Sequence, residues 1–318
     1  MGRKVFIHGA QTDNYNIMGK KEITRKKFLT TALAGIAALK ILPEAGGMNV
    51  SGNSLRNKIG KTGIEVSPVC FGASRTTEES LVRYAIEKGI NFIDTGQSYS
   101  NGNNERLIGK ATSGIRDKVV IQTKIRLDPD ELSTGGKGKK GAREIRAILS
   151  AKFETSLKSL KSDYIDILLY HDASEEFLLF HPEVMDFFSG LKDSGVIRAH
   201  GFSTHNDRMM LLERNIREHF YDINMIPFNH KGSFTHSVTG KFSEWDQKKL
   251  LSILTEVSDK GIGIIAMKTC SGDKYSPSQD ITPSYGQAVK WVIQHPYISS
   301  ASVAMVNFEQ VNEHVSLL

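Results

Sequence analysis

The chain has 318 residues, which is enough for one large domain or two ordinary ones. Its formal net charge is +6, but residues 1–45 hold eight of the 41 basic residues and only three of the 35 acidic ones. The remaining 33 basic and 32 acidic residues nearly cancel, so the basic balance does not indicate nucleic-acid binding. The two cysteines, Cys70 and Cys270, lack metal-ligand spacing, which argues against an iron–sulfur or structural zinc site.

Residues 1–45 have the layout of an export signal, a basic region followed by an apolar stretch over residues 28–42. Residues 24–29 (TRKKFL) resemble a twin-arginine motif with Lys in place of the second Arg, and Met18 would be a more ordinary start than the first residue. We therefore expect a periplasmic protein. Lys40 interrupts the apolar stretch and no A-x-A site follows, so an amphipathic helix on a cytoplasmic protein is the alternative. The stretch is shorter than the ~20 residues of a membrane span.

Beyond the leader, short apolar runs alternate with longer amphipathic patterns, which is typical of repeated strand–helix units. We predict strands at residues 69–72, 91–94, 119–124, 165–170, 199–202, 222–226, 263–267 and 301–304. We predict helices at residues 78–88, 105–112, 142–161, 183–193, 207–218, 244–260 and 283–295, and a last one from residue 308. These counts favour a single (β/α)8 TIM barrel over residues 46–318. An open doubly wound sheet would usually carry G-x-G-x-x-G after its first strand, where this sequence has none.

Four polar residues stand at or just past predicted strand ends: Asp94, Tyr99, Lys124 and His171. Strand ends converge on one rim of a barrel, where such folds place their chemistry, so we expect the four side chains to meet. A tyrosine is a poor acid with a pKa of about 10. A nearby ammonium should lower that pKa, and a carboxylate should keep the lysine charged. With the histidine bonding a carbonyl oxygen, the set could protonate an oxygen as hydride reaches its carbon.

The flanking residues make this interpretation specific. Residues 92–99 (FIDTGQSY) and 104–111 (NERLIGKA) closely resemble the first signature of the aldo-keto reductases. Residues 60–67 resemble that family's opening β-hairpin, and residues 196–203 are similar to its fifth strand. The resemblance runs from about residue 55 to the end of the chain. It implies a barrel with an N-terminal hairpin, NADP or NAD as cofactor, and carbonyl–alcohol redox chemistry with Tyr99 as general acid and base.

The resemblance also implies which residues contact the nicotinamide, but several of these positions depart from the family pattern. Ser203 matches the family serine that contacts the carboxamide, and Thr204 stands where the family usually has Asn. Met225 stands in place of a glutamine near the end of strand six. Met267, followed by Lys268, stands in place of the aromatic residue that stacks on the nicotinamide.

Residues 304–313 lie where family members bind the adenosine 2′-phosphate. Members that prefer NADP place basic residues there, whereas this sequence has Ala304 and Gln310. This departure puts a preference for NADP in doubt and leaves NAD open. Asn307 could meet the adenosine or cap the last helix.

The sequence does not name the substrate. The chain ends soon after its last helix begins, so the pocket should be open, and we expect a small polar or sugar-like carbonyl or alcohol. The changed contacts at Met225 and Met267 leave a second possibility, a catalytically weak dinucleotide-binding sensing or interaction module. A third possibility is a hydrolase on an unrelated barrel, which would need paired carboxylates or metal ligands at strand ends. Asp94 and Asp172 are its candidates, and a His171/Asp172 metal pair lacks further ligands, so no metal is expected. An exported enzyme would need a bound dinucleotide and a redox partner or second substrate to recycle it.

Two long segments, residues 128–141 and 229–241, follow predicted strands and therefore lie on the same rim. The first contains four glycines and three lysines within residues 135–141. Either segment could close over the substrate or the cofactor phosphates, or be a solvated surface loop.

Overall fold

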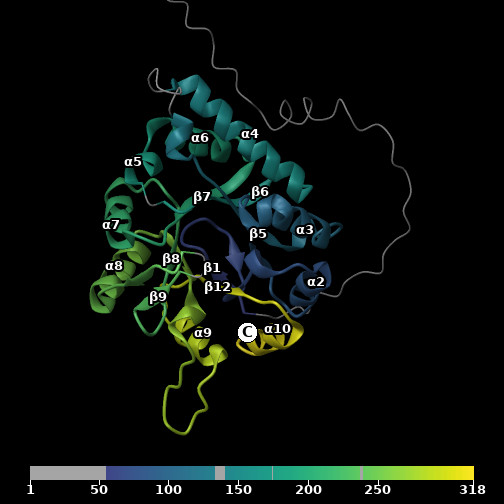
Figure 1. The fold of residues 1–318 in the computed structure, drawn as a ribbon, viewed down its shortest axis with the longest axis vertical. Coiled ribbons are helices and arrows are strands. Elements are labelled where there is room, and N and C mark those ends of the chain that lie inside the picture. Colours follow the sequence, from purple (N-terminus) through teal and green to yellow (C-terminus); the bar gives the residue numbers. More distant parts are fainter. Residues whose placement is uncertain (1–54, 133–139, 174, 237–238) are drawn as a thin grey trace, which may run out of the picture. The chain divides into compact units, whose positions relative to one another are not determined.

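A parallel, closed barrel forms the centre of the molecule. The computed structural model describes residues 55–132, 140–173, 175–236 and 239–318, and all of these belong to one compact unit. Eight strands follow one another in the order β11-β12-β3-β4-β5-β6-β7-β8, and helices surround them (Figure 1). The predicted (β/α)8 barrel is therefore confirmed. The predicted leader lies outside the described residues.

The barrel strands lie close to the predicted runs. They are β3 (Val69–Gly72), β4 (Phe92–Asp94), β5 (Val120–Ile125), β6 (Ile165–Tyr170), β7 (Ile197–Ser203), β8 (Ile223–Pro227), β11 (Gly263–Met267) and β12 (Ser300–Ala304). Nearly every residue of these strands is buried, because one face meets the barrel interior and the other meets the helices. The barrel closes where β12 pairs with β3, Ala301 opposite Val69 and Ala304 opposite Gly72.

Eight of the helices also match the prediction: α2 (Glu79–Glu87), α3 (Asn103–Ala111), α4 (Ala142–Leu160), α6 (Pro182–Asp193), α7 (Arg208–Glu218), α8 (Gln247–Asp259), α9 (Tyr285–Ile293) and α10 (Phe308–Val315). In α8 the buried residues Leu250, Ile253, Leu254 and Val257 recur at helical spacing, so one face packs on the barrel. The Asp246 side chain caps this helix by accepting from the Lys249 amide. The short helix α5 (Glu176–Leu179) was not predicted, because four residues carry no readable periodicity.

An antiparallel hairpin, β1 (Asn57–Lys58) and β2 (Glu65–Val66), covers the amino-terminal end of the barrel, as the resemblance implied. Its contacts go to residues that directly precede barrel strands. The Lys61 amide donates to the Gly261 carbonyl before β11 at 2.8 Å, and the Asn57 side chain donates to the Ser299 carbonyl before β12 at 3.1 Å. Gly60 has φ +48°, and a Cβ there would lie 2.4 Å from the Gly261 oxygen, so only glycine fits.

The second long segment contains secondary structure that the sequence did not reveal. Strands β9 (Ser233–Thr235) and β10 (Phe242–Glu244) pair as an antiparallel hairpin. The sequence Ser-Phe-Thr has only one apolar residue, so this short strand lacks the alternation that would have revealed it. In the first segment Pro129–Leu132 form a 3-10 turn, and residues 133–139, with most of its glycines and lysines, lie outside the described residues.

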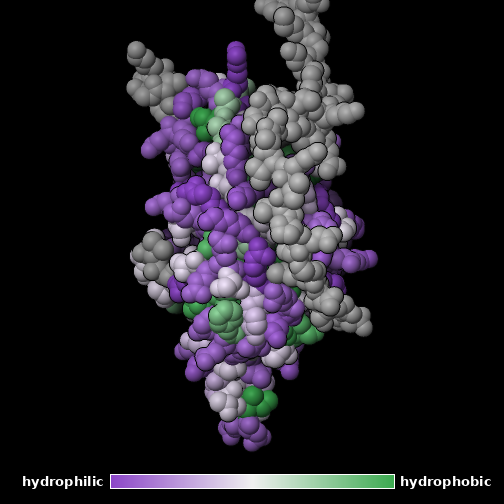
Figure 2. All heavy atoms as spheres, turned by 90° about the vertical axis from the view of Figure 1, so that its right-hand side faces the viewer, coloured by the Kyte–Doolittle hydropathy of each residue, from purple (hydrophilic) through white to green (hydrophobic). Residues whose placement is uncertain are grey.

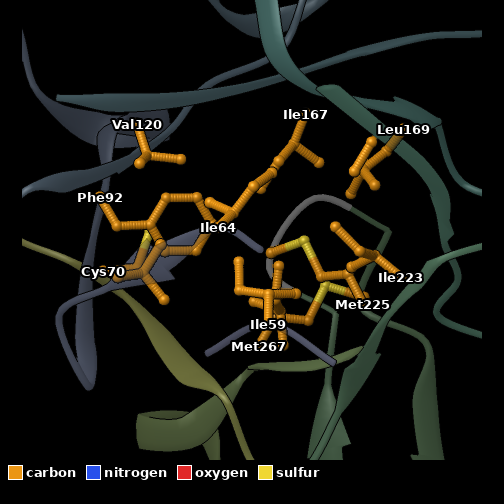
Figure 3. Close-up of a cluster of buried hydrophobic side chains, with 13 residues drawn as sticks. Ile59, Ile64, Cys70, Phe92, Val120, Ile167, Leu169, Ile223, Met225 and Met267 are labelled. Atoms are coloured by element: carbon orange, nitrogen blue, oxygen red, sulfur yellow. The ribbon is translucent and has the colours of Figure 1, made fainter. Parts of the chain in front are cut away.

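The barrel interior holds a continuous hydrophobic cluster. Figure 3 shows Ile59 and Ile64 of the hairpin region meeting Phe92, Met225 and Met267 from barrel strands. The outer surface shown in Figure 2 is mostly hydrophilic, with isolated apolar residues. Among the described residues, no helix is both long and apolar enough to span a membrane.

Candidate active site

Three neighbouring strands bring the four predicted catalytic side chains to the carboxyl rim. Asp94 ends β4, Lys124 lies near the end of β5, and His171 directly follows β6. Tyr99 begins the 3-10 turn η3 (Tyr99–Gly102), which follows β4. The structure therefore places all four side chains together, as expected from the convergence of parallel strand ends.

Lys124 is the centre of this group. Its side chain is only 1% exposed, and its ammonium donates to the Asp94 carboxylate, to the Thr95 carbonyl at 2.7 Å and to the Tyr99 hydroxyl at 3.1 Å. Burial alone would lower the pKa of Lys124, but Asp94 and Tyr99 outweigh it and the pKa is raised. The lysine therefore stays charged, with each of its three protons directed at an oxygen.

Asp94 is held by two further donors that the sequence did not single out. Gln122 donates to one carboxylate oxygen at 2.6 Å, and Ser302 on β12 donates to the other at 3.2 Å. Gln122 is a fully buried amide, and it stands beside Thr123 and Lys124 in a strand whose residues are all buried, so this run of buried polar residues was the signal available in the sequence. A buried carboxylate with this many hydrogen-bond donors is fixed in place.

The pKa of Tyr99 differs from the expected direction. Burial raises the pKa above the ordinary value of 10, and the charge of Lys124 opposes that effect without reversing it. The predicted lowering by Lys124 is therefore present, but the net shift is upward, because the sequence does not show how deeply the phenol is buried. At neutral pH the Tyr99 phenol is protonated and can donate.

His171 faces the tyrosine. The two ring centroids are 5.6 Å apart with the rings nearly perpendicular, and the Ser98 hydroxyl lies 3.3 Å from His171 Nδ1. Burial, helped by the charge of Lys124, lowers the pKa of His171 to about 3. The imidazole is therefore neutral at physiological pH, and a hydrogen bond donated by Ser98 to Nδ1 would leave Nε2 as the donor.

The residues predicted to contact the nicotinamide form hydrogen bonds or pack against other residues of the chain. Ser203 Oγ accepts from the Asp172 amide at 3.1 Å, and Thr204 Oγ1 donates to the Ala173 carbonyl at 3.0 Å. Met225 and Met267 belong to the hydrophobic cluster of the barrel interior (Figure 3). Their roles in cofactor binding stay predictions.

The other predicted cofactor residues lie after β11 and β12. Lys268 adopts a left-handed backbone, and burial together with the neighbouring Arg75 lowers its pKa. Asn307 caps α10 by accepting from the Gln310 amide at 2.9 Å, and Gln310 accepts from the Val306 amide at 2.8 Å. The capping alternative for Asn307 is thus observed, and contacts to adenosine remain predictions.

Asp172, which the sequence suggested only for the hydrolase alternative, lies beside a histidine and an arginine in the structure. His205 Nδ1 lies 3.0 Å from the Asp172 carboxylate, and Arg126 lies 3.6 Å from it. Within the described residues, no three His, Cys, Asp or Glu side chains are grouped so that they could hold a metal ion.

The fold and this rim define the class of protein. The model of the Aldo/keto reductase family matches residues 71–314, and the chain belongs to that family. It is 32% identical over 154 residues to the uncharacterized oxidoreductase YqkF of Bacillus subtilis, and 32% identical over 166 residues to the aldo-keto reductase YhdN of the same organism. These matches cover 47% and 48% of this chain, and 48% and 47% of the two relatives. The match thus spans about half the length of these curated relatives.

Among solved structures, an aldo/keto reductase from Klebsiella pneumoniae in complex with NADP and acetate is similar, with a TM-score of 0.60 and 20% identity. The similarity covers 83% of this chain and 90% of that one. At this identity the likeness supports the fold, and the family match confirms the resemblance of the sequence motifs.

Proposed function

We propose that the protein is an NAD(P)-dependent aldo-keto reductase that interconverts a carbonyl and an alcohol on a small polar or sugar-like molecule. The observation that carries the proposal is the contact of 3.1 Å between the Tyr99 hydroxyl and the buried ammonium of Lys124. A protonated phenol, an ammonium that stabilises the phenolate after proton loss, and a neutral imidazole form a proton-donating site for a carbonyl oxygen.

In the direction of reduction, His171 hydrogen-bonds the carbonyl oxygen and orients it toward Tyr99. Tyr99 then gives its proton to that oxygen, and Lys124 stabilises the phenolate that remains. Asp94 keeps Lys124 charged and fixed during this transfer. In oxidation the phenolate takes the proton back from the alcohol. The nicotinamide cofactor, when bound, supplies or accepts the hydride.

The rim carries positive charge suited to a dinucleotide. Lys268 is half-buried at the end of β11, and Arg75 is close enough to help lower its pKa. A half-buried ammonium that feels the charge of a guanidinium favours an anionic group such as a pyrophosphate. Ser203, Thr204 and Lys268 would hold the cofactor, with Asn307 and Gln310 toward the adenosine. The aldo/keto reductase from Klebsiella pneumoniae is in complex with NADP, whereas Ala304 and Gln310 of this chain leave NAD open, so both cofactors enter the test.

The test uses the full chain, NADH and NADPH in separate assays, and the reactive substrate 4-nitrobenzaldehyde. Tyr99→Phe should lower kcat by about a hundredfold or more while changing cofactor affinity little, because the hydroxyl acts only in proton transfer. Tyr84→Phe is the matched control, since its hydroxyl bonds Asn312 at 2.8 Å on the outer helices. Equal turnover by wild type and Tyr99→Phe would remove Tyr99 from the donor role. Tight cofactor binding without any turnover would favour the sensing module.

We also propose that residues 1–45 direct export, on the strength of the basic and apolar leader alone. Replacing Arg25 and Lys26 by Gln should then keep the protein in the cytoplasm, as measured by cell fractionation. A periplasmic fraction unchanged by these substitutions would rule out a twin-arginine-like route. If export is found, a redox partner or second substrate must recycle the cofactor.

A further inference from the structure

A second charged group stands beside His171 and is not used by the proton-donating set. Asp172 follows His171 directly, with a left-handed backbone at φ +51°. Its amide donates to Ser203 Oγ at 3.1 Å, and the next amide, that of Ala173, donates to the Ser203 carbonyl at 2.7 Å. The end of β7 therefore fixes this turn, and with it the position of the Asp172 side chain.

Two partners on either side hold the carboxylate of Asp172. His205 Nδ1 lies 3.0 Å from one oxygen, and Arg126 Nη1 lies 3.6 Å from the other. Arg126 contacts Asp128 more closely, at 2.9 Å, so its positive charge is shared between the Asp128 and Asp172 carboxylates. The hydrogen bond from His205 lowers the pKa of Asp172 although burial opposes it, so the carboxylate is ionised at neutral pH.

This carboxylate lies within electrostatic reach of the reacting groups. Its negative charge raises the pKa of both Tyr99 and His171, against the effect of Lys124. Its side chain is 36% exposed, whereas Asp94 is almost fully buried. Asp172, directly after His171, is therefore a carboxylate of the rim that a substrate can touch while its carbonyl lies at Tyr99 and His171.

We infer that Asp172, held by His205 and Arg126, binds the hydroxyl groups of a polyhydroxylated substrate next to its reacting carbonyl. A carboxylate has about four lone-pair sites, and among the described side chains His205 forms a hydrogen bond to one of the two oxygens, while Arg126 at 3.6 Å contributes charge. Alcohol hydroxyls can donate to the rest, and an ionised acceptor makes these bonds strong. An aldehyde without hydroxyl groups would offer the Asp172 carboxylate no such hydrogen bond and would bind less well. This inference rests on the proposed function and specifies its substrate class.

The experiment compares two three-carbon aldehydes, glyceraldehyde and propanal, in the full-length protein. Asp172→Asn is the substitution of choice, because Asn tolerates the left-handed backbone and keeps the size of the side chain. It should lower kcat/KM for glyceraldehyde about tenfold or more, mainly through KM, and kcat/KM for propanal much less. Each substrate is compared with its own wild-type value, so the different reactivity of the two aldehydes cancels.

Asp186→Asn is the matched control, because Asp186 pairs with Arg146 on the outer helices and should leave both substrates unchanged. His205→Gln is a second variant that keeps Asp172, and it should raise KM for glyceraldehyde by a smaller factor. An equal loss with both aldehydes, or no loss, in Asp172→Asn would overturn the inference. Suppose that the wild type turns over 4-nitrobenzaldehyde but has no higher kcat/KM for glyceraldehyde than for propanal. This result would overturn the inference while leaving the proposed function intact. Failure with all three aldehydes would count against both.

Discussion

Replacing Lys124 by Met is the substitution whose effect the structure defines most sharply. The change removes a buried ammonium and leaves the Asp94 carboxylate, only 4% exposed, without its countercharge. Breaking a buried ion pair from one side costs about 3–5 kcal/mol. For a domain of this size that corresponds to a fall in Tm of roughly 6–20 °C. Urea and thermal unfolding of the full chain would measure the loss.

The double variant Asp94→Leu/Lys124→Met tests the reason for that loss. Removing both charges abolishes the unpaired carboxylate, so the protein should regain stability relative to the single variant. The recovery should stop about 1–3 kcal/mol short of wild type, because Gln122 and Ser302 lose their acceptor. Activity should stay low in both variants, since neither can stabilise the Tyr99 phenolate.

Lys192→Met is the matched control for this series. Lys192 pairs with Asp222 at 2.6 Å, but its side chain is 39% exposed, so the substitution should cost about 1 kcal/mol or less. A cost for Lys124→Met no larger than that of Lys192→Met would refute the reasoning. A double variant as unstable as the single one would show that the unpaired carboxylate is not the cause.

Two further predictions concern pH and packing. The kcat/KM of reduction should be constant between about pH 6 and 9. The pKa of His171 is about 3 and that of Tyr99 lies above its usual 10, so neither group changes charge in this range. A pH–rate profile that bends with an apparent pKa between 6 and 7 would contradict this prediction. Gly109→Ala in α3 should destabilise the protein by more than about 2 kcal/mol in urea, because its Cβ would lie 2.5 Å from the Ser159 carbonyl. Gly190→Ala in α6 meets nothing within 4 Å and should instead gain about 0.5–1 kcal/mol.

The barrel and the reactive quartet were readable from the sequence because both depend on chain order. Apolar runs predict strands, and the rule that strand ends share a rim places Asp94, Lys124 and His171 together from the sequence alone. How deeply each of these side chains is buried could not be predicted from the sequence. The direction of the Tyr99 pKa shift depends on burial, which arises from the whole fold and which the sequence motif does not contain.

Partners contributed by distant segments were also beyond the sequence. Ser302 reaches Asp94 from a strand more than two hundred residues later, and His205 meets Asp172 only because β6 and β7 are neighbours. Neither contact has a spacing rule that would single it out. The hairpin of β9 and β10 was missed for a different reason, since its short strands follow no clear alternation.

The hairpin of β1 and β2 has a consequence for how ligands reach the active site. It occupies the end of the barrel next to Gly261 and Ser299, opposite to the rim where Tyr99 lies. For a reductase built this way, dinucleotide and substrate have to enter and leave through one shared opening. A ligand that already occupies this opening would then narrow the path of the other.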